Sequence, residues 1–217
     1  VGLGADVLHQ GDVFLVPVVV VVGSLTPDAI VAAQDGYSFS VIPHWFVVTP
    51  WGAVAFILFF VSGLVESNRT PFDVPEGESE IVAGHMTEYS GFKYAIFFLG
   101  EYLGMFAVSG LAVTLFLGGW HAPLRVLEFV PSYIWFFGKL SILIFVFIWV
   151  RGTLPRTRID QMMNFAWKFM LPMAFACIIA AAVWHYEGRR LMGWFWSFGM
   201  LAAVYLVLSR ILETGKK

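Results

Sequence analysis

Charged residues are scarce in this chain of 217 residues, and their scarcity excludes most classes of soluble protein. Asp, Glu, Lys and Arg make up 13% of the sequence, about half of the roughly 25% that is typical of soluble domains. The formal net charge of -2 provides no basic surface for a nucleic acid. Hydrophobic residues make up 59% of the sequence and occur in long runs. The chain is therefore predicted to be a membrane protein.

Cysteines and metal-ligating motifs are too few for several common kinds of chemistry. Cys177 is the only cysteine and lies inside an apolar run, so neither a disulfide framework nor a cysteine-ligated iron–sulfur cluster fits this chain alone. The segment HMTE lacks the paired histidines of a zinc protease, and DVPEGESE lacks the ligand ladder of a calcium loop. We expect no metal site, and we expect any redox centre to lie on another chain.

The beginning of the sequence does not resemble a signal peptide. A signal peptide would begin with an initiator methionine and a basic segment, and VGLGADVLHQGDVFLVPVVV has neither. We expect the sequence to be a fragment of a longer chain, with residues 1–217 forming a single transmembrane domain. We find no internal repeat and no loop long enough for a second folded domain.

The apolar runs predict an all-α fold, a polytopic bundle of transmembrane helices. A run of about 18 or more apolar residues is long enough to cross a bilayer. The first run is short and rich in valine, so we expect an unusual span there. Pro50 and Pro172 lie near the starts of their predicted helices, where a missing N–H does least harm. About six spans are expected, at 12–25, 45–65, 94–117, 133–150, 165–184 and 192–212.

Basic and aromatic residues indicate how these spans lie in a bilayer. Lys and Arg are enriched in the short loops on the cytoplasmic side, or on the matrix side in mitochondria. Most of them fall in 66–93, in 151–163 and near the C-terminus, so these segments are predicted to share the inside face. The tryptophans near predicted span ends, where amphipathic rings favour the headgroup region, are Trp45, Trp51, Trp120, Trp184 and Trp194.

The segment ESNRTPFDVPEGESE, residues 66–80, places much negative charge directly after an apolar run. Solvation of a surface loop is the simplest interpretation. Apolar residues are interleaved with the charges, however, and Pro71 and Pro75 stiffen the backbone, which favours a defined segment packed against protein. The series also continues into the next span, where an ionisable group is costly and indicates function. The acidic residues of the series are Glu66, Asp73, Glu76, Glu78, Glu80, Glu88 and Glu101.

Two features inside the predicted spans allow more than one interpretation. Lys139 lies in WFFGKLSILIFVF, where its side chain either snorkels to the interface or has a function. Gly100 and Gly104 form a GxxxG pair, which lets helices approach closely and would shield Glu101 from lipid. Carboxyl groups spaced in this way can pass protons along, because burial and like charges raise their pKa values toward neutral pH.

Three ordered motifs identify the family that this sequence resembles. ESNRTPFDVPEGESEIVAGHMTEYSGFKYAIFFLGEY is followed by TLFLGGW and then by FIWVRGTLPRTRIDQMMNFAWKFMLP. Together they closely resemble the quinone-site membrane subunit of respiratory complex I, the family of the bacterial H subunit and of mitochondrial NADH dehydrogenase subunit one. The likeness runs from about residue 23 to residue 172 and is weaker in the last helix.

The resemblance implies a part of a proton-translocating NADH-quinone oxidoreductase, within the quinone tunnel and within an acidic funnel toward the proton pumps. Quinone is the implied substrate, whereas FMN and iron–sulfur clusters are expected only on partner subunits. The implied partners are the hydrophilic quinone-reducing subunits, including the one with the terminal iron–sulfur cluster, and other membrane-arm subunits. By motif, the implied residues are Glu66, Glu76, Glu78, Glu80, Glu88, Glu101 and Lys139 for proton coupling, Arg69, Phe72 and Asp73 for the quinone cavity, and Arg151, Arg156, Arg158 and Asp160 in the second inside loop.

This sequence departs from the family pattern because the N-terminal helices, including a quinone-entry helix, are missing. No complete active site is therefore expected on this chain alone. We expect the bacterial cytoplasmic (inner) membrane rather than the mitochondrial inner membrane. Two alternatives stay open: the homologous membrane subunit of an energy-converting hydrogenase-type complex, and an ion transporter. Transporters often have paired repeats and broken helices at corresponding positions, and the sequence indicates neither.

Overall fold

Helices make up nearly all of the regular structure in the computed structural model, which describes residues 13–38, 42–67, 71–72, 89–155, 157–187 and 191–214. The predicted all-α fold is confirmed. Strands are limited, within these ranges, to a small antiparallel hairpin that pairs Tyr37 with Pro43. In chain order, the elements are α2 (Val16–Val22), α3 (Pro27–Ala33), β1 (Tyr37–Ser38), β2 (Ile42–Pro43), the 3-10 helix η1 (Phe46–Val48), α4 (Pro50–Glu66), α5 (Phe92–Phe116), the 3-10 helix η3 (Arg125–Leu127), α6 (Ser132–Thr153), α7 (Ile159–Phe165), the π-helix η4 (Ala166–Met170), α8 (Leu171–Glu187) and α9 (Leu191–Thr214).

Within the described ranges, three helical stretches are long and apolar enough to cross a bilayer unbroken. They are α5, α6 and the stretch Asp160–Tyr186, which joins α7, η4 and α8. The other three predicted spans correspond to the pair α2 and α3, to the 17-residue α4, and to the 24-residue α9. Each of the six expected spans thus has a helical counterpart.

The first predicted span is a broken helix rather than a short straight one. Gly23 ends α2 in the left-handed region, at φ 74°, with its N–H bonded to the carbonyl of Val19. Pro27 then begins α3, where proline fits the first turn. The two helices form an angle of 70°. The glycine and the proline stop and restart the helix within four residues, so the first span is unusual, as expected.

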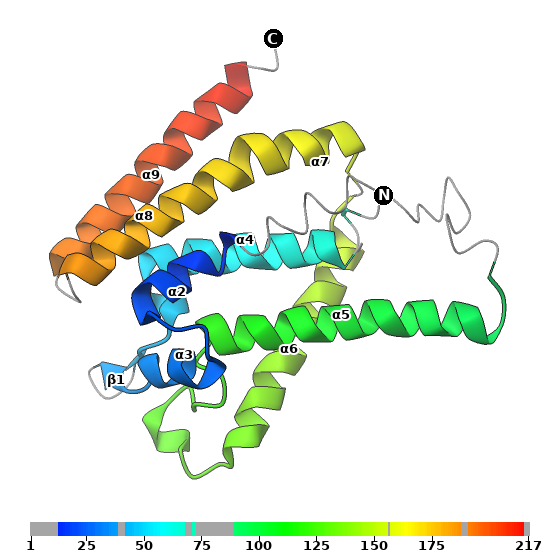
Figure 1. Ribbon diagram of the computed structural model, residues 1–217, viewed down its shortest axis with the longest axis horizontal. Coiled ribbons are helices and arrows are strands. Elements are labelled where there is room, and N and C mark those ends of the chain that lie inside the picture. The colour runs from blue at the N-terminus through cyan, green and yellow to red at the C-terminus, as the bar shows by residue number, and fades with distance from the viewer. Residues whose placement is uncertain are drawn as a thin grey trace.

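The fifth predicted span contains a π-helical segment. Figure 1 shows α7 and α8 as one long helical stretch, and η4 lies between them. Leu171 follows η4 directly, and Pro172 is the second residue of α8, so it lies near the start of that helix as expected. The helical stretch is nevertheless continuous through η4. Proline lacks an N–H and its ring presses on the preceding turn. A widened π turn, which accommodates an extra residue within a helix, precedes it here. Pro50 begins α4 as expected, and the Thr49 hydroxyl accepts a bond from the N–H of Gly52.

The apolar core forms around α4, which packs against α2, α5, α8 and α9. Figure 1 shows α9 lying alongside α8, and α4 lying alongside α5. Trp51 is fully buried near the start of α4 and packs against Phe46, with ring centroids 5.3 Å apart. Trp184 is buried as well, whereas Trp120 and Trp194 keep exposed rings. The expectation of headgroup contact is therefore wrong for Trp51 and Trp184, whose rings serve the protein core.

Candidate functional site

About half of the predicted site residues lie in the described part of the chain. Glu66, Phe72, Glu101, Lys139, Arg151, Arg158 and Asp160 are described there, and each is considered below. The predicted residues that lie outside the described ranges are Arg69, Asp73, Glu76, Glu78, Glu80, Glu88 and Arg156. Their roles in the quinone cavity, the acidic funnel and the second inside loop stay predictions.

The two predicted inside loops are in direct contact. The carbonyl of Pro71 accepts hydrogen bonds from the backbone N–H and from the hydroxyl of Thr157, both at 2.9 Å. Phe72, the neighbouring residue and a predicted quinone-cavity residue, is buried in the apolar core. Paired bonds to one carbonyl hold the 66–93 loop to the 151–163 loop across 86 residues of chain. This contact agrees with the predicted placement of both loops on one face.

Glu66 and Glu101 lie at the same end of the α4–α5 pair. Gly63 of α4 faces Val108 of α5 so closely that a Cβ on Gly63 would collide with the Val108 side chain. Glu66 follows Gly63 by three residues toward the end of α4, and Glu101 precedes Val108 by seven residues toward the start of α5. Both carboxylates therefore lie on the same side of the Gly63 contact; that this side is the inside face stays a prediction.

The surroundings of the two carboxylates differ. Glu101, Met105 and Val108 follow each other at helical spacing, and residues three or four apart share one face of a helix. Met105 and Val108 are buried, so Glu101 continues the buried face of α5. Its side chain is half-buried, and its Oε2 atom is shielded from solvent. Glu66, the last residue of α4, is exposed.

The GxxxG pair beside Glu101 makes no helix contact within the described chain. A Cβ built on Gly100 or on Gly104 would find nothing within 4 Å, and both glycines are exposed. The expectation that a close helix contact at this pair shields Glu101 is therefore wrong within these residues. The half-burial of Glu101 comes instead from its place on the face of α5 that turns toward α4.

The described charged residues of the second inside loop are exposed and lie at helix ends. Arg151 is in the last turn of α6, where a cation interacts favourably with the helix dipole. Arg158 precedes α7, and its backbone N–H donates to the side-chain oxygen of Gln161 at 3.3 Å. Asp160 is in the first turn of α7, where a carboxylate is favoured. All three side chains are available for contact with a partner.

Lys139 is bound inside the protein rather than extended to an interface. Its Nζ donates to the backbone carbonyls of Leu117 at 2.7 Å, Gly119 at 3.0 Å and His121 at 2.7 Å. The same atom lies 4.1 Å from the centroid of the Trp45 ring, and the residue is only 8% exposed. The snorkelling interpretation therefore does not hold. The predicted role of Lys139 in proton coupling stays a prediction.

Gln34 is a buried polar residue that the sequence analysis did not single out. It is 1% exposed, and its Oε1 accepts bonds from the backbone N–H of Phe46 and of Gly118. Its Nε2 lies within hydrogen-bond distance of the carbonyls of Ile30, Thr114 and Leu115. A lone glutamine in a polar turn gives no sequence signal for this role, because its partners lie up to 84 residues away.

A polar pocket of about 260 Å³ lies next to this region. In it, His121 Nδ1 lies 3.8 Å from Asp35 Oδ1, which forms an ion pair when the imidazole is protonated. Among the described residues, no group of three or more His, Cys, Asp and Glu side chains could hold a metal ion. The pocket is lined by Asp35, Tyr37, Trp120, His121, Ala122, Glu128, Val130, Ser132 and Trp135.

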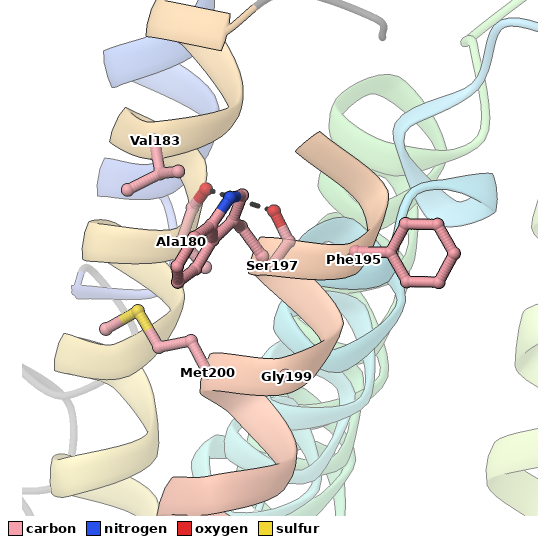
Figure 2. Close-up of a pocket in the computed structure, with 7 residues that line it drawn as sticks. Ala180, Val183, Phe195, Ser197, Gly199 and Met200 are labelled. Atoms are coloured by element: carbon pink, nitrogen blue, oxygen red, sulfur yellow. Dashed lines mark hydrogen bonds between the residues drawn. The ribbon is translucent and has the colours of Figure 1, made fainter. Parts of the chain in front are cut away.

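An apolar pocket of about 590 Å³ lies between α8 and α9 (Figure 2). The Ser197 hydroxyl reaches the carbonyl of Ala180 across it, at 3.5 Å. None of the predicted site residues within the described ranges lines it. Its lining residues are Ala180, Val183, Phe195, Trp196, Ser197, Gly199 and Met200.

Comparison with known proteins finds one family over most of the chain. The family model described as NADH dehydrogenase matches residues 12–182. The H subunit of the NADH-quinone oxidoreductase of Burkholderia vietnamiensis is 47% identical over 176 residues, which cover 78% of this chain and 48% of the relative. The same subunit of Paraburkholderia xenovorans is 45% identical over 172 residues, which cover 78% of this chain and 49% of the relative. The chain thus spans about half the length of these curated relatives.

Proposed function

The chain belongs to the NADH dehydrogenase family of membrane proteins, and from this premise we propose that it is the part of a NADH-quinone oxidoreductase in which quinone reduction is coupled to proton translocation. The relatives, which are named as the H subunit of that enzyme, support this proposal. In it, the chain provides walls and acidic groups, while a complete active site needs further segments and partner subunits.

The observation that carries the proposal is the arrangement where α4 ends and α5 begins. Glu66 and Glu101 lie at the same end of this helix pair, and Pro71 is bound there to Thr157 of the second inside loop. Glu66, at the start of the loop, is the first member of the predicted acidic series, and Glu101, within α5, is the last. We propose that protons pass along this series, through Glu76, Glu78, Glu80 and Glu88, between the loop and the membrane.

The quinone is proposed to lie beside the 66–80 loop. Arg69, Phe72 and Asp73 would line its cavity, and the burial of Phe72 in the core supports an apolar wall at that place. Quinone is the substrate in this proposal rather than a resident cofactor. The exposed Arg151, Arg158 and Asp160 would contact a hydrophilic partner, together with Arg156.

FMN and iron–sulfur clusters are proposed to lie on partner subunits. An iron–sulfur cluster needs several cysteine thiolates, and Cys177 is alone and buried in α8. The partners would be the hydrophilic quinone-reducing subunits, including the one with the terminal cluster, and other subunits of the membrane arm. The bacterial cytoplasmic membrane is the proposed location, since the relatives named above are bacterial.

Substitution of Glu101 by Gln tests this function. Gln has nearly the same shape and can form hydrogen bonds, but it cannot bind and release a proton at neutral pH. The Glu101→Gln enzyme should therefore assemble normally, and its quinone-linked turnover and its proton pumping should fall together. The measurement is NADH-driven pumping in reconstituted vesicles, normalised to the assembled complex.

The matched control is Glu128→Gln. Glu128 is exposed in the loop between α5 and α6, on the predicted outside face, so the same chemical change should leave pumping unaltered there. Full pumping by the Glu101→Gln enzyme would reject the proposed relay through this residue.

A further inference from the structure

We propose that Lys139 acts as a tethered structural cation that locks the end of α5 to α6 rather than as a proton carrier, and that the carbonyl site which holds it can bind a free ammonium or potassium ion. The site consists of the carbonyl oxygens of Leu117, Gly119 and His121 and the face of the Trp45 ring. Nothing in the proposed proton path requires this cation to titrate.

The hydrogen-bonding capacity of the ammonium group is filled by this site. An ammonium group has three N–H donors and no acceptor, and three carbonyl oxygens lie 2.7 to 3.0 Å from Nζ. A backbone carbonyl has no proton to exchange, so none of these partners can take part in a relay. Loss of a proton from Lys139 would also leave one of these carbonyls without its donor. The contacts therefore favour a fixed charge over a proton carrier.

The carbonyl site is formed by the turn that follows α5. Gly118 and Gly119 both have positive φ, 69° and 52°, which glycine adopts readily. This turn places the carbonyls of Leu117, Gly119 and His121 around one point, beyond the last turn of α5. The C-terminus of a helix carries partial negative charge, and an aromatic face adds to the attraction for a cation.

The site would also suit a small free cation. Backbone carbonyls coordinate potassium ions in channel filters by replacing their hydration shell, and ammonium ions form the same bonds as the lysine group. In this chain the cation is delivered by α6, so its binding joins α6 to the end of α5. Since α5 also carries Glu101, we regard Lys139 as a positioning residue for that helix.

The first test compares two substitutions in the complete enzyme. Lys139→Arg keeps a positive charge, but arginine does not release its proton in proteins. Lys139→Met keeps the apolar stem and removes the charge. A fixed charge predicts that the Arg enzyme keeps most of its quinone-linked turnover, while the Met enzyme loses about tenfold or more in turnover or in assembled complex. An assembled Arg enzyme that is as inactive as the Met enzyme would overturn the proposal.

The second test is chemical rescue of Lys139→Ala, which leaves room for a free ion. The purified complex is measured in choline chloride, ammonium chloride and potassium chloride at equal ionic strength, for its midpoint of thermal disassembly and for its turnover. We expect ammonium or potassium to restore at least about half of the loss, while choline, which is too large, restores none. Lys168→Ala, in which an exposed lysine is removed, should show no such difference between the salts.

Three outcomes of the rescue experiment would count against the proposal. Lys139→Ala could match the unaltered enzyme in choline, it could be equally impaired in all three salts, or it could regain thermal stability in ammonium without regaining turnover. The last result would return Lys139 to the proton relay. The turnover readout rests on the proposed function, whereas the thermal readout does not. If the Glu101→Gln enzyme pumps normally, the proposed relay through Glu101 fails, but ammonium or potassium should still raise the thermal stability of the Lys139→Ala complex.

Discussion

The side-chain oxygen of Gln34 accepts a hydrogen bond of 3.0 Å from the backbone N–H of Gly118, which lies 84 residues further along the chain. This bond joins the end of α3 to the turn after α5. The same turn provides carbonyl oxygens for Lys139 of α6. Gln34, which precedes this turn in the chain, and Lys139, which follows it, thus both bind the turn. The turn therefore connects α3, α5 and α6.

Replacement of Gln34 by Leu should weaken this connection strongly. Leu has a similar volume but neither donates nor accepts, so several buried backbone groups lose their partner, at about 1 to 3 kcal/mol each. We expect a loss of about 3 kcal/mol in stability, seen as a lower midpoint of thermal disassembly and less assembled complex. Gln161→Leu is the matched control, because Gln161 is exposed and its loss should cost under about 1 kcal/mol. Equal midpoints for the two variants would contradict this role of Gln34.

Substitution of Gly118 by Ala should distort the turn after α5. Its φ of 69° is unfavourable for alanine, and a Cβ there would collide with the indole of Trp45. The combined cost is about 3 kcal/mol, and the displaced Trp45 ring should also weaken the binding of Lys139. Thermal disassembly of the purified complex measures the effect. Gly110→Ala, within α5, is the control, since a Cβ there meets nothing within 4 Å. A greater loss from Gly110→Ala would refute the argument.

Reversal of charge at Arg69 or Asp73 should impair the quinone reaction alone. Both residues are predicted to lie at the quinone cavity, whereas the flavin that accepts electrons from NADH is proposed to lie on another chain. Quinone reductase activity should therefore fall about tenfold or more, as is typical when a positioning group is lost, while NADH oxidation by a hydrophilic artificial acceptor stays nearly unchanged. Glu128→Lys is the control. A parallel fall of both activities in fully assembled enzyme would remove these residues from the cavity.

Labelling of single cysteines should place the two inside loops on one face of the membrane. Ser90→Cys and Leu154→Cys are exposed positions in these loops, and Leu124→Cys is exposed in the loop after α5. A membrane-impermeant maleimide should label the first two only in inside-out vesicles and the third only in right-side-out ones. Cys177 is fully buried and should stay unlabelled in the parent chain.

The labelling is repeated on vesicles washed at alkaline pH, which removes peripheral subunits, so that a position covered by a partner subunit is not mistaken for one on the other face. Labelling of Ser90→Cys and Leu154→Cys from opposite faces would reject the predicted topology and the proposed grouping of Glu66 with the second inside loop.

The long helices could be predicted from the sequence because they are long apolar runs whose ends are marked by polar residues, proline or glycine. The break after α2 could have been found in the sequence, since Gly23 and Pro27 lie four residues apart between two apolar segments. Glycine often ends a helix and proline often begins one. The π-helix before Pro172 leaves a weaker signal, because a proline inside an apolar run is also compatible with a helix start.

The candidate site could be predicted less completely. Lys139 stood out as a charge in an apolar run, but its carbonyl partners belong to a turn 18 to 22 residues earlier in the chain, and backbone atoms leave no trace in a sequence. Gln34 was missed for the same reason. For Glu101, Gly100 and Gly104 suggested a contact that the described chain does not make.

The π-helical segment Ala166–Met170 sets the rotation of α7 relative to α8. A π turn takes up one residue more than an α turn, so it acts as a single-residue insertion in a helix that is otherwise continuous. Each residue of an α-helix turns the chain by about 100°. Deletion of one residue from this segment would restore an unbroken α-helix, but it would also rotate the exposed Asp160 by about that angle around the helix axis. The direction in which the second inside loop presents its charges is therefore fixed by one residue inside the membrane span.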